Sequence, residues 1–448
     1  MIASDRVIPG VIDSTVLRRM EVSRPTPSVA EIEENPVQLR FRTLQSVAAI
    51  SLVAGVIAVA PGLANAAPGQ GGAPGQTLFV FNHNMQSASA HGHGNGSGCG
   101  NARYSTIGAA VAAANSGDTV MVCPGIYDED VVVNKTLTLI GQNATIDATG
   151  FDNGVQVLAS HSAVEGLVVE NAIGEGILVQ GIPGTPISDV TISGNTVVHN
   201  DQGNPTGAPI AGSAYAECNA GANNVPGDCG EGIHLMVADN STVAGNKVTG
   251  NSGGILLTDE FGPTDNNLIV NNDVSDNTLD CGVTVAGHNT GAFSGGTPQP
   301  SVGGVFDNTI LGNHITNNGV AGQGAGVILA TGGPGGAVYD NRVQGNYISG
   351  NGLAGVTVHS HAPGQDLNGN TIENNKIGTN NLDGDIDFSP LVDESTTGVL
   401  VASVTPLSIT IEHNLIADNF YGIWLTPMVN VSGESTNMFV NVTTPVGP

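Results

Sequence analysis

The sequence predicts an all-β solenoid, in which short strands stack as successive coils around one core. The chain of 448 residues contains 64 Gly, and a chain rich in Gly and Asn with few helix formers favours strands joined by tight turns. Only 11% of the residues are charged and 40% are hydrophobic, which excludes ordinary disorder. A repeated pair of short motifs completes the argument for this fold class.

The first motif is Asn-x-[Val/Ile]-x-x-Asn, as in "NKVTGN", and the second is a strand of the form Gly-[Ile/Val]-x-[Leu/Val], as in "GIHL". Such short strands cannot bury a face alone, but they can when they stack as coils. One Asn per coil at the same turn can hydrogen-bond the Asn of the next coil, so we expect these Asn residues to be structural. The pairs are Asn195/Asn200, Asn246/Asn251, Asn272/Asn277, Asn313/Asn318, Asn346/Asn351, Asn375/Asn380 and Asn414/Asn419.

This pattern resembles the right-handed parallel β-helix repeat proteins of the pectin-lyase-like superfamily over residues 99–448. The resemblance implies a right-handed parallel β-helix, but it does not imply one reaction, since a fold does not fix a function. The segment "YSTIGAAVAAANSGDTV" is similar to the N-terminal piece of that superfamily. It implies a short capping helix over about 106–115, with Ser105 as the N-cap. Ala110, Val111 and Ala114 would cover the open end of the first coil.

The N-terminus has the features of a targeting signal. Arg40 and Arg42 precede an apolar run over 46–60, and the small residues Ala64-Asn65-Ala66 follow it. This order is typical of a secretory signal peptide, and the run is short for a membrane span.

We therefore expect a leader and signal peptide over 1–66, a Gly-rich linker with the start of the first strand over 67–98, and the β-helix over 99–448. The mature protein would be secreted, extracellular or at the cell surface, with no membrane contact after cleavage.

The net charge and the cysteines limit the classes of binding partner and the disulfides that can be expected. The formal net charge is −28, and nucleic acid is excluded because phosphate binding needs clustered Lys and Arg. An oxidising destination permits disulfides, and we expect Cys99–Cys123 and Cys218–Cys229. Cys281 is left over and is interpreted as a small buried residue. The expected partner is a polysaccharide or oligosaccharide, bound by a monomer.

Counting from the Gly that opens each second strand, positions +1 and +3 are apolar and point inward, so +2, +4 and +6 point outward. Glu260, His288 and His361 share the +6 offset. Because coils stack about 4.8 Å apart, this predicts a polar row in a groove on the outer face, with loops 289–303 and 378–397 as its walls. The predicted substrate-binding residues are His288, His359, His361, His234 and Trp424.

Two carboxylates near a His on such a surface are the equipment for cleaving a glycosidic bond. We expect Glu260, with Asp259 or Asp280 as the second carboxylate, to do the acid/base work. A His can tune either carboxylate or act as the base of an elimination. The alternative interpretation is that the row is only the solvated face of a soluble β-helix.

A weaker candidate site is "DGDID", whose Asp383, Asp385 and Asp387 could hold Ca²⁺ through oxygen ligands. A solvated acidic loop is the simpler interpretation, so we expect no required cofactor.

Three functions remain open. The first is a glycoside hydrolase acting on a neutral polysaccharide, the second a polysaccharide lyase or epimerase that uses a His base on a uronate glycan, and the third a non-catalytic glycan-binding protein.

The resemblance favours the first. Pectate-lyase-like members use an Arg or Lys base, and no Lys or Arg falls at the outward offsets. Members similar to polygalacturonases carry Asp-Asp-Cys, Gly-His-Gly and Arg-x-Lys segments. Here "LDCGVTVAGHN" keeps Asp280-Cys281 and Gly287-His288 but not the rest, which fits a substrate without carboxylates.

Overall fold

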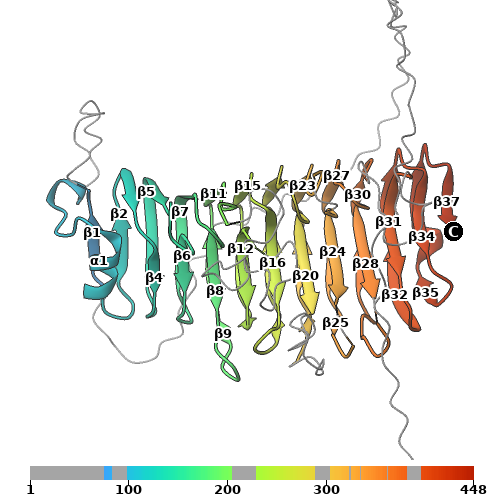
Figure 1. The fold of residues 1–448 in the computed structure, drawn as a ribbon, viewed down its shortest axis with the longest axis horizontal. Helices are drawn as coiled ribbons and strands as arrows, with labels where there is room; N and C mark the ends of the chain where they lie inside the picture. Colours follow the sequence, from blue (N-terminus) through green and yellow to red (C-terminus); the bar gives the residue numbers. More distant parts are fainter. Residues whose placement is uncertain are drawn as a thin grey trace, which may run out of the picture. The chain divides into compact units, whose positions relative to one another are not determined.

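The computed structural model describes residues 75–82, 98–203, 229–287, 303–321, 324–332, 334–360, 362–380 and 395–447. The chain divides into two units, Met1–Gln70 and Gly71–Pro448, and every described residue belongs to the second. This unit is a stack of coils whose strands pair in parallel with the strands of the next coil (Figure 1). The predicted all-β parallel helix is therefore confirmed.

The coils form three sheets. The 11-stranded sheet contains β4 (Val131–Val133), β6 (Val155–Val157), β8 (Ile177–Gln180), β12 (Glu231–Met236), β16 (Gly253–Thr258), β20 (Val283–Gly287), β24 (Val327–Thr331), β28 (Val356–Ser360), β31 (Thr397–Ala402), β34 (Tyr421–Leu425) and β37 (Thr444–Gly447). The 5-stranded sheet contains β9 (Ile187–Ser188), β13 (Ala238–Asp239), β17 (Thr264–Asp265), β21 (Val305–Phe306) and β25 (Val338–Tyr339).

The 21-stranded sheet contains β1 (Thr77–Val80), β2 (Thr119–Val122), β3 (Gly125–Asp128), β5 (Thr138–Asp147), β7 (Ala163–Glu170), β10 (Thr191–Ser193), β11 (Thr196–Val198), β14 (Thr242–Ala244), β15 (Lys247–Thr249), β18 (Leu268–Val270), β19 (Asp273–Ser275), β22 (Thr309–Leu311), β23 (His314–Thr316), β26 (Arg342–Gln344), β27 (Tyr347–Ser349), β29 (Thr371–Glu373), β30 (Lys376–Ile377), β32 (Leu407–Glu412), β33 (Leu415–Ala417), β35 (Val429–Ser432) and β36 (Met438–Val440). Among the described residues, the helical elements are α1 (Ile107–Ala113), η2 (Cys99–Asn101) and η3 (Glu434–Thr436).

The repeated Asn residues form ladders along the stack, as the sequence predicts. In the first ladder the side chain of Asn195 donates to Asn246 at 3.0 Å, and Asn246 donates in turn to Asn272 at 3.0 Å. The contacts continue to Asn437, whose own backbone N–H is bonded inside the chain to the carbonyl of Glu434. Each rung also donates to a backbone carbonyl of a preceding coil, such as that of Val164. Buried turn backbone is thereby satisfied at every coil.

A second ladder runs through the partner Asn of each pair, from Asn200 and Asn251 to Asn380 and Asn419. A third ladder, which the repeat motif does not contain, links Asn267, Asn308, Asn341 and Asn370 at the corner next to the 5-stranded sheet.

The register of the 11-stranded sheet matches the offsets counted from the sequence. Leu256 pairs with Thr284, Thr284 with Ile328, and Ile328 with Thr357. The +1 and +3 residues of each strand, such as Ile255 and Leu257, belong to the apolar core, and the residue between them does not. The +2 and +4 side chains therefore lie on the outer face of this sheet.

Helix α1 covers the first coil, with Ala110 and Val111 buried as expected. The N-cap is Thr106 rather than Ser105, because the Thr106 backbone is extended and its hydroxyl accepts the Ala109 N–H. Glu129 adds a second cap, since its carboxylate accepts the N–H groups of Ile107 and Gly108. These contacts satisfy the free donors of the first turn.

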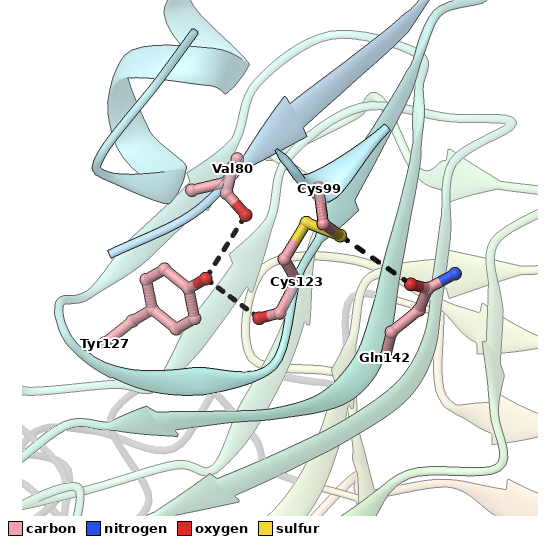
Figure 2. The surroundings of a disulfide bond; sticks show 5 residues. All are labelled: Val80, Cys99, Cys123, Tyr127 and Gln142. Carbon is pink, nitrogen blue, oxygen red and sulfur yellow. Dashed lines mark hydrogen bonds between the residues drawn. A yellow bond between two sulfur atoms is a disulfide. The ribbon is translucent and has the colours of Figure 1, made fainter. Parts of the chain in front are cut away.

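A disulfide joins Cys99 to Cys123, as predicted. Figure 2 shows the bond beside Tyr127, whose hydroxyl donates to the carbonyl of Cys123 at 2.8 Å. Burial raises the pKa of Tyr127 to about 12. Cys229 is also disulfide-bonded, whereas its expected partner Cys218 lies outside the described residues.

No helix within the described ranges is long and apolar enough to cross a membrane. The expected signal peptide lies outside these ranges.

Candidate functional site

The outer face of the 11-stranded sheet is mostly buried, which corrects the expectation of an open groove. Thr258 is 0% exposed and His234 1% exposed, although both occupy outward offsets. An exception is β24, where Ile328 and Ala330 are partly exposed. Offsets alone could not reveal this, because they give the direction of a side chain and not what lies over it. Most residues of the expected walls at 289–303 and 378–397 lie outside the described residues.

The structure does not bring Glu260 and Asp280 together. Strands β16 and β20 pair Ile255 with Val283; Glu260 follows β16, whereas Asp280 precedes β20. They lie at opposite ends of paired strands about 16 Å long, at roughly 3.3 Å per residue. Carboxylates that share a glycosidic bond stand at most about 9.5 Å apart, so these two cannot act on one bond.

Asp259 has a structural contact. Its carboxylate is fully buried and accepts the backbone N–H of Gly304 at 3.0 Å. This bond fixes the corner between β16 and β21. Glu260, the next residue, is partly exposed in the turn.

Asp280 has a different carboxylate neighbour, Glu231, across a glycine. A side chain on Gly253 would begin 2.8 Å from the Oε1 atom of Glu231 and 3.3 Å from the Cβ atom of Asp280. Because Gly253 has no side chain, the two acidic side chains approach each other over it. Glu231 is buried, whereas Asp280 is partly exposed.

Asp280 also lies against the free thiol of Cys281. Burial raises the pKa of that thiol, and the charge of Asp280 raises it further. The Cys281 sulfur accepts the backbone N–H of Ala325 at 3.1 Å. Cys281 is thus the small buried residue that the sequence predicts.

A buried Glu, His and Thr make a second polar cluster on this sheet. The Nδ1 atom of His234 lies 3.5 Å from a carboxylate oxygen of Glu175, and its Nε2 atom lies 2.8 Å from the hydroxyl of Thr258. The imidazole is therefore held between an acid and a hydroxyl from two neighbouring coils. Such a carboxylate contact fixes the orientation of an imidazole ring.

Glu175 and Glu231 are not among the residues predicted from the sequence. Both directly precede the opening Gly of a second strand, in "EGILV" and "EGIHL". The outward offsets +2, +4 and +6 run forward from that Gly, so they do not include the position before it. The repeat of Glu-Gly-Ile in two successive coils was the available signal.

The structure does not bring the other predicted residues together in one site. His359 lies in one column with Ala330 and is 7% exposed. Trp424 packs in an apolar cluster with Leu400 and Ala402, which corrects its assignment to sugar stacking: the neighbouring strand supplies a large apolar partner at the same offset. His288 and His361 lie outside the described residues, as do Asp383, Asp385 and Asp387. No group of three or more metal-ligating side chains occurs among the residues the structure does describe.

The described strands of this sheet carry no Lys or Arg. Lys247, Arg342 and Lys376 lie on strands of the 21-stranded sheet. Arg103 and Lys135 lie outside the strands, and the Lys135 amine donates to the carbonyls at the end of α1. Among the described residues, no Lys or Arg belongs to the 11-stranded sheet.

Comparisons with known proteins agree with this architecture. The family model described as "Right handed beta helix region" matches residues 131–298 and 292–432. No match was found among curated proteins.

Among solved structures, the A-module of mannuronan C-5 epimerase AlgE6 from Azotobacter vinelandii aligns with a TM-score of 0.50 and 17% identity, over 76% of this chain and 91% of that chain. The AlgE4 A-module from the same organism gives a TM-score of 0.48 and 17% identity, with 76% and 91% covered. A polygalacturonase from Erwinia carotovora ssp. carotovora gives 0.42 and 12%, with 82% and 99% covered. At this identity the likeness concerns the fold alone. The family model matches more than half of the residues of this chain, so the chain belongs to the right-handed β-helix family.

Proposed function

We propose that this chain is a secreted carbohydrate-active enzyme, a glycoside hydrolase that cleaves a neutral polysaccharide at Glu231 and Asp280. The observation that carries this proposal is the approach of the two acidic side chains across Gly253. Glycosidases use carboxyl groups about 5–9.5 Å apart, one as acid and the other as base or nucleophile. Both side chains lie within 3.3 Å of one point, the position of an added Cβ atom on Gly253, so their carboxyl groups can adopt such a separation. The substrate would approach the pair from the side of the partly exposed Asp280.

The two environments suggest the roles. Burial favours the neutral form of a carboxyl group, so Glu231 is assigned as the general acid that protonates the leaving oxygen. Asp280, nearer to solvent, is assigned as the base that activates water. His234, held by Glu175, is assigned to position the acidic pair.

The absence of Lys and Arg from the described part of the sheet supports a substrate without carboxylates, because a uronate would need a cationic partner. A polysaccharide substrate is also consistent with the fold shared with the epimerase module.

The test begins with a panel of neutral and acidic glycans, on which new reducing ends report hydrolysis. On the glycan that is cleaved, Glu231→Gln should lower kcat by about 10²-fold or more with an unchanged melting temperature. Glu165→Gln on β7, a partly exposed residue of the 21-stranded sheet, is the matched control and should keep full activity. If Glu260→Gln abolishes activity and Glu231→Gln does not, the acid/base work lies at the other end of the strand and the proposal is wrong.

The Glu175–His234 contact favours one second candidate, a lyase or epimerase that uses His234 as its base. Formation of unsaturated, ultraviolet-absorbing ends or of an epimerised uronate would support it. Binding of a glycan without any new ends would instead support the non-catalytic alternative.

A further inference from the structure

Among the described strands, those of the last coil pair with strands on one side only. Strands β35, β36 and β37 pair with β32, β33 and β34, and no other described strand pairs with their far edges. An open edge presents a row of N–H and C=O groups that can accept another strand.

The inward side chains of this coil are partly uncovered. Val431 pairs with Ile409 and Phe439 with Ile416. Ile409 and Ile416 are buried, whereas Val431 and Phe439 are only partly so. On β36 the two outward side chains are apolar as well, with Met438 63% and Val440 41% exposed.

This end is also almost uncharged, in a chain with a net charge of −28. From residue 420 onward Glu434 is the single charged residue. Like charges that face each other across an interface cost several kcal/mol, so two copies would repel each other at most surfaces but not at this one.

The opposite end of the stack differs, because α1 lies over the first coils and buries Ile107 and Ala110 there. A head-to-tail contact between copies would have to displace that helix. A contact between two C-terminal ends would not, and a two-fold axis can set an open edge strand antiparallel to its own counterpart.

We propose that the C-terminal coil, formed by β35, β36 and β37, is a docking surface for a second copy of this chain, which meets it through the same coil. The contact closes on itself, so it produces a dimer and not a fibre. The proposal differs from the sequence-based expectation of a monomer and is independent of the proposed activity.

The test is sedimentation of the full chain at micromolar concentrations. The wild type should be dimeric, and Met438→Glu, which places like charges near each other across the two-fold axis, should weaken the dimer by at least about 10-fold. Ile182→Glu is the matched control, because Ile182 is also 63% exposed; it should leave the dimer intact. Circular dichroism checks that both variants keep the β-sheet signal.

A monomeric wild type would overturn the proposal, and so would a dimer that both variants leave unchanged. Hydrogen exchange adds an independent readout. Amide protection in β36 should rise with protein concentration, whereas protection that does not depend on concentration would mean that the chain covers its own end.

Discussion

The Asn ladders and the polar cluster on the 11-stranded sheet are both buried, yet they differ in how their partners are supplied. In a ladder each residue bonds the same residue type one coil away, for example Asn272 to Asn313 at 3.0 Å. In the cluster His234 contacts a Glu from one coil and a Thr from another. Polar burial that repeats at each coil satisfies backbone and holds the stack, whereas polar burial that occurs once is available for chemistry.

The largest effect is expected from breaking a ladder at its middle. Asn313→Ala removes the acceptor of two Asn272 donors and the donor to the carbonyl of Ile269. Each buried group left without a partner costs about 1–3 kcal/mol, so the free energy of unfolding should fall by about 3–5 kcal/mol in chemical denaturation. Asn437→Ala, at the half-buried last rung, should cost about 1 kcal/mol. Equal losses at the two positions would contradict this account of the ladder.

This contrast also explains what the sequence could predict. The ladders and the strand register could be predicted because the same residue types recur at fixed offsets. The pair Asn246 and Asn251, for example, has an equivalent pair in the next coil. The same offsets also predict the wide separation of Asp280 from Glu260. Asp280 lies two residues before the opening Gly of its strand, whereas Glu260 lies six residues after the opening Gly of the neighbouring strand. The burial of Thr258 and His234 was not readable, since it depends on chain segments distant in sequence that share no repeat.

A smaller effect on stability, but a large one on activity, is expected at Gly253. A new side chain would begin 2.8 Å from Oε1 of Glu231, which is the mobile end of its side chain and can shift. Gly253→Ala should therefore lower the free energy of unfolding by less than about 1 kcal/mol. If Glu231 is the general acid, as proposed, its displacement should lower kcat by about 10-fold or more.

Gly100→Ala is the control, because nothing lies within 4 Å of its added side chain. If Gly253→Ala keeps full activity on the identified glycan, Glu231 has no catalytic role.

The smallest effect is expected in the 5-stranded sheet, where Asp239 pairs with Asp265 in the next coil. Burial raises the pKa of Asp265 above 3.8, and the charges of Asp239 and Asp307 raise it further. A carboxyl group whose pKa is higher in the folded chain than in the unfolded chain binds more protons when folded. Its contribution to stability is therefore lost as the pH rises from 3.8 through the folded pKa.

Asp265→Asn should accordingly raise the free energy of unfolding at about pH 7. The gain should be less than about 1 kcal/mol, because solvent screens the repulsion between the carboxylates. It should have no effect below about pH 3, where wild-type Asp265 is protonated. Melting temperatures of the two proteins across this pH range check the sign, and a variant that is less stable at neutral pH would refute the repulsion.

The first Asn ladder tolerates very unequal amounts of chain between its rungs. Successive rungs are separated by 51, 26, 41, 33, 29, 39 and 23 residues, yet their side-chain contacts all measure 2.9–3.0 Å. Coil length is thus decoupled from coil geometry. Evolution can lengthen, shorten or exchange the connection after a strand without moving the frame, and a protein engineer can graft a new connection at the same junctions.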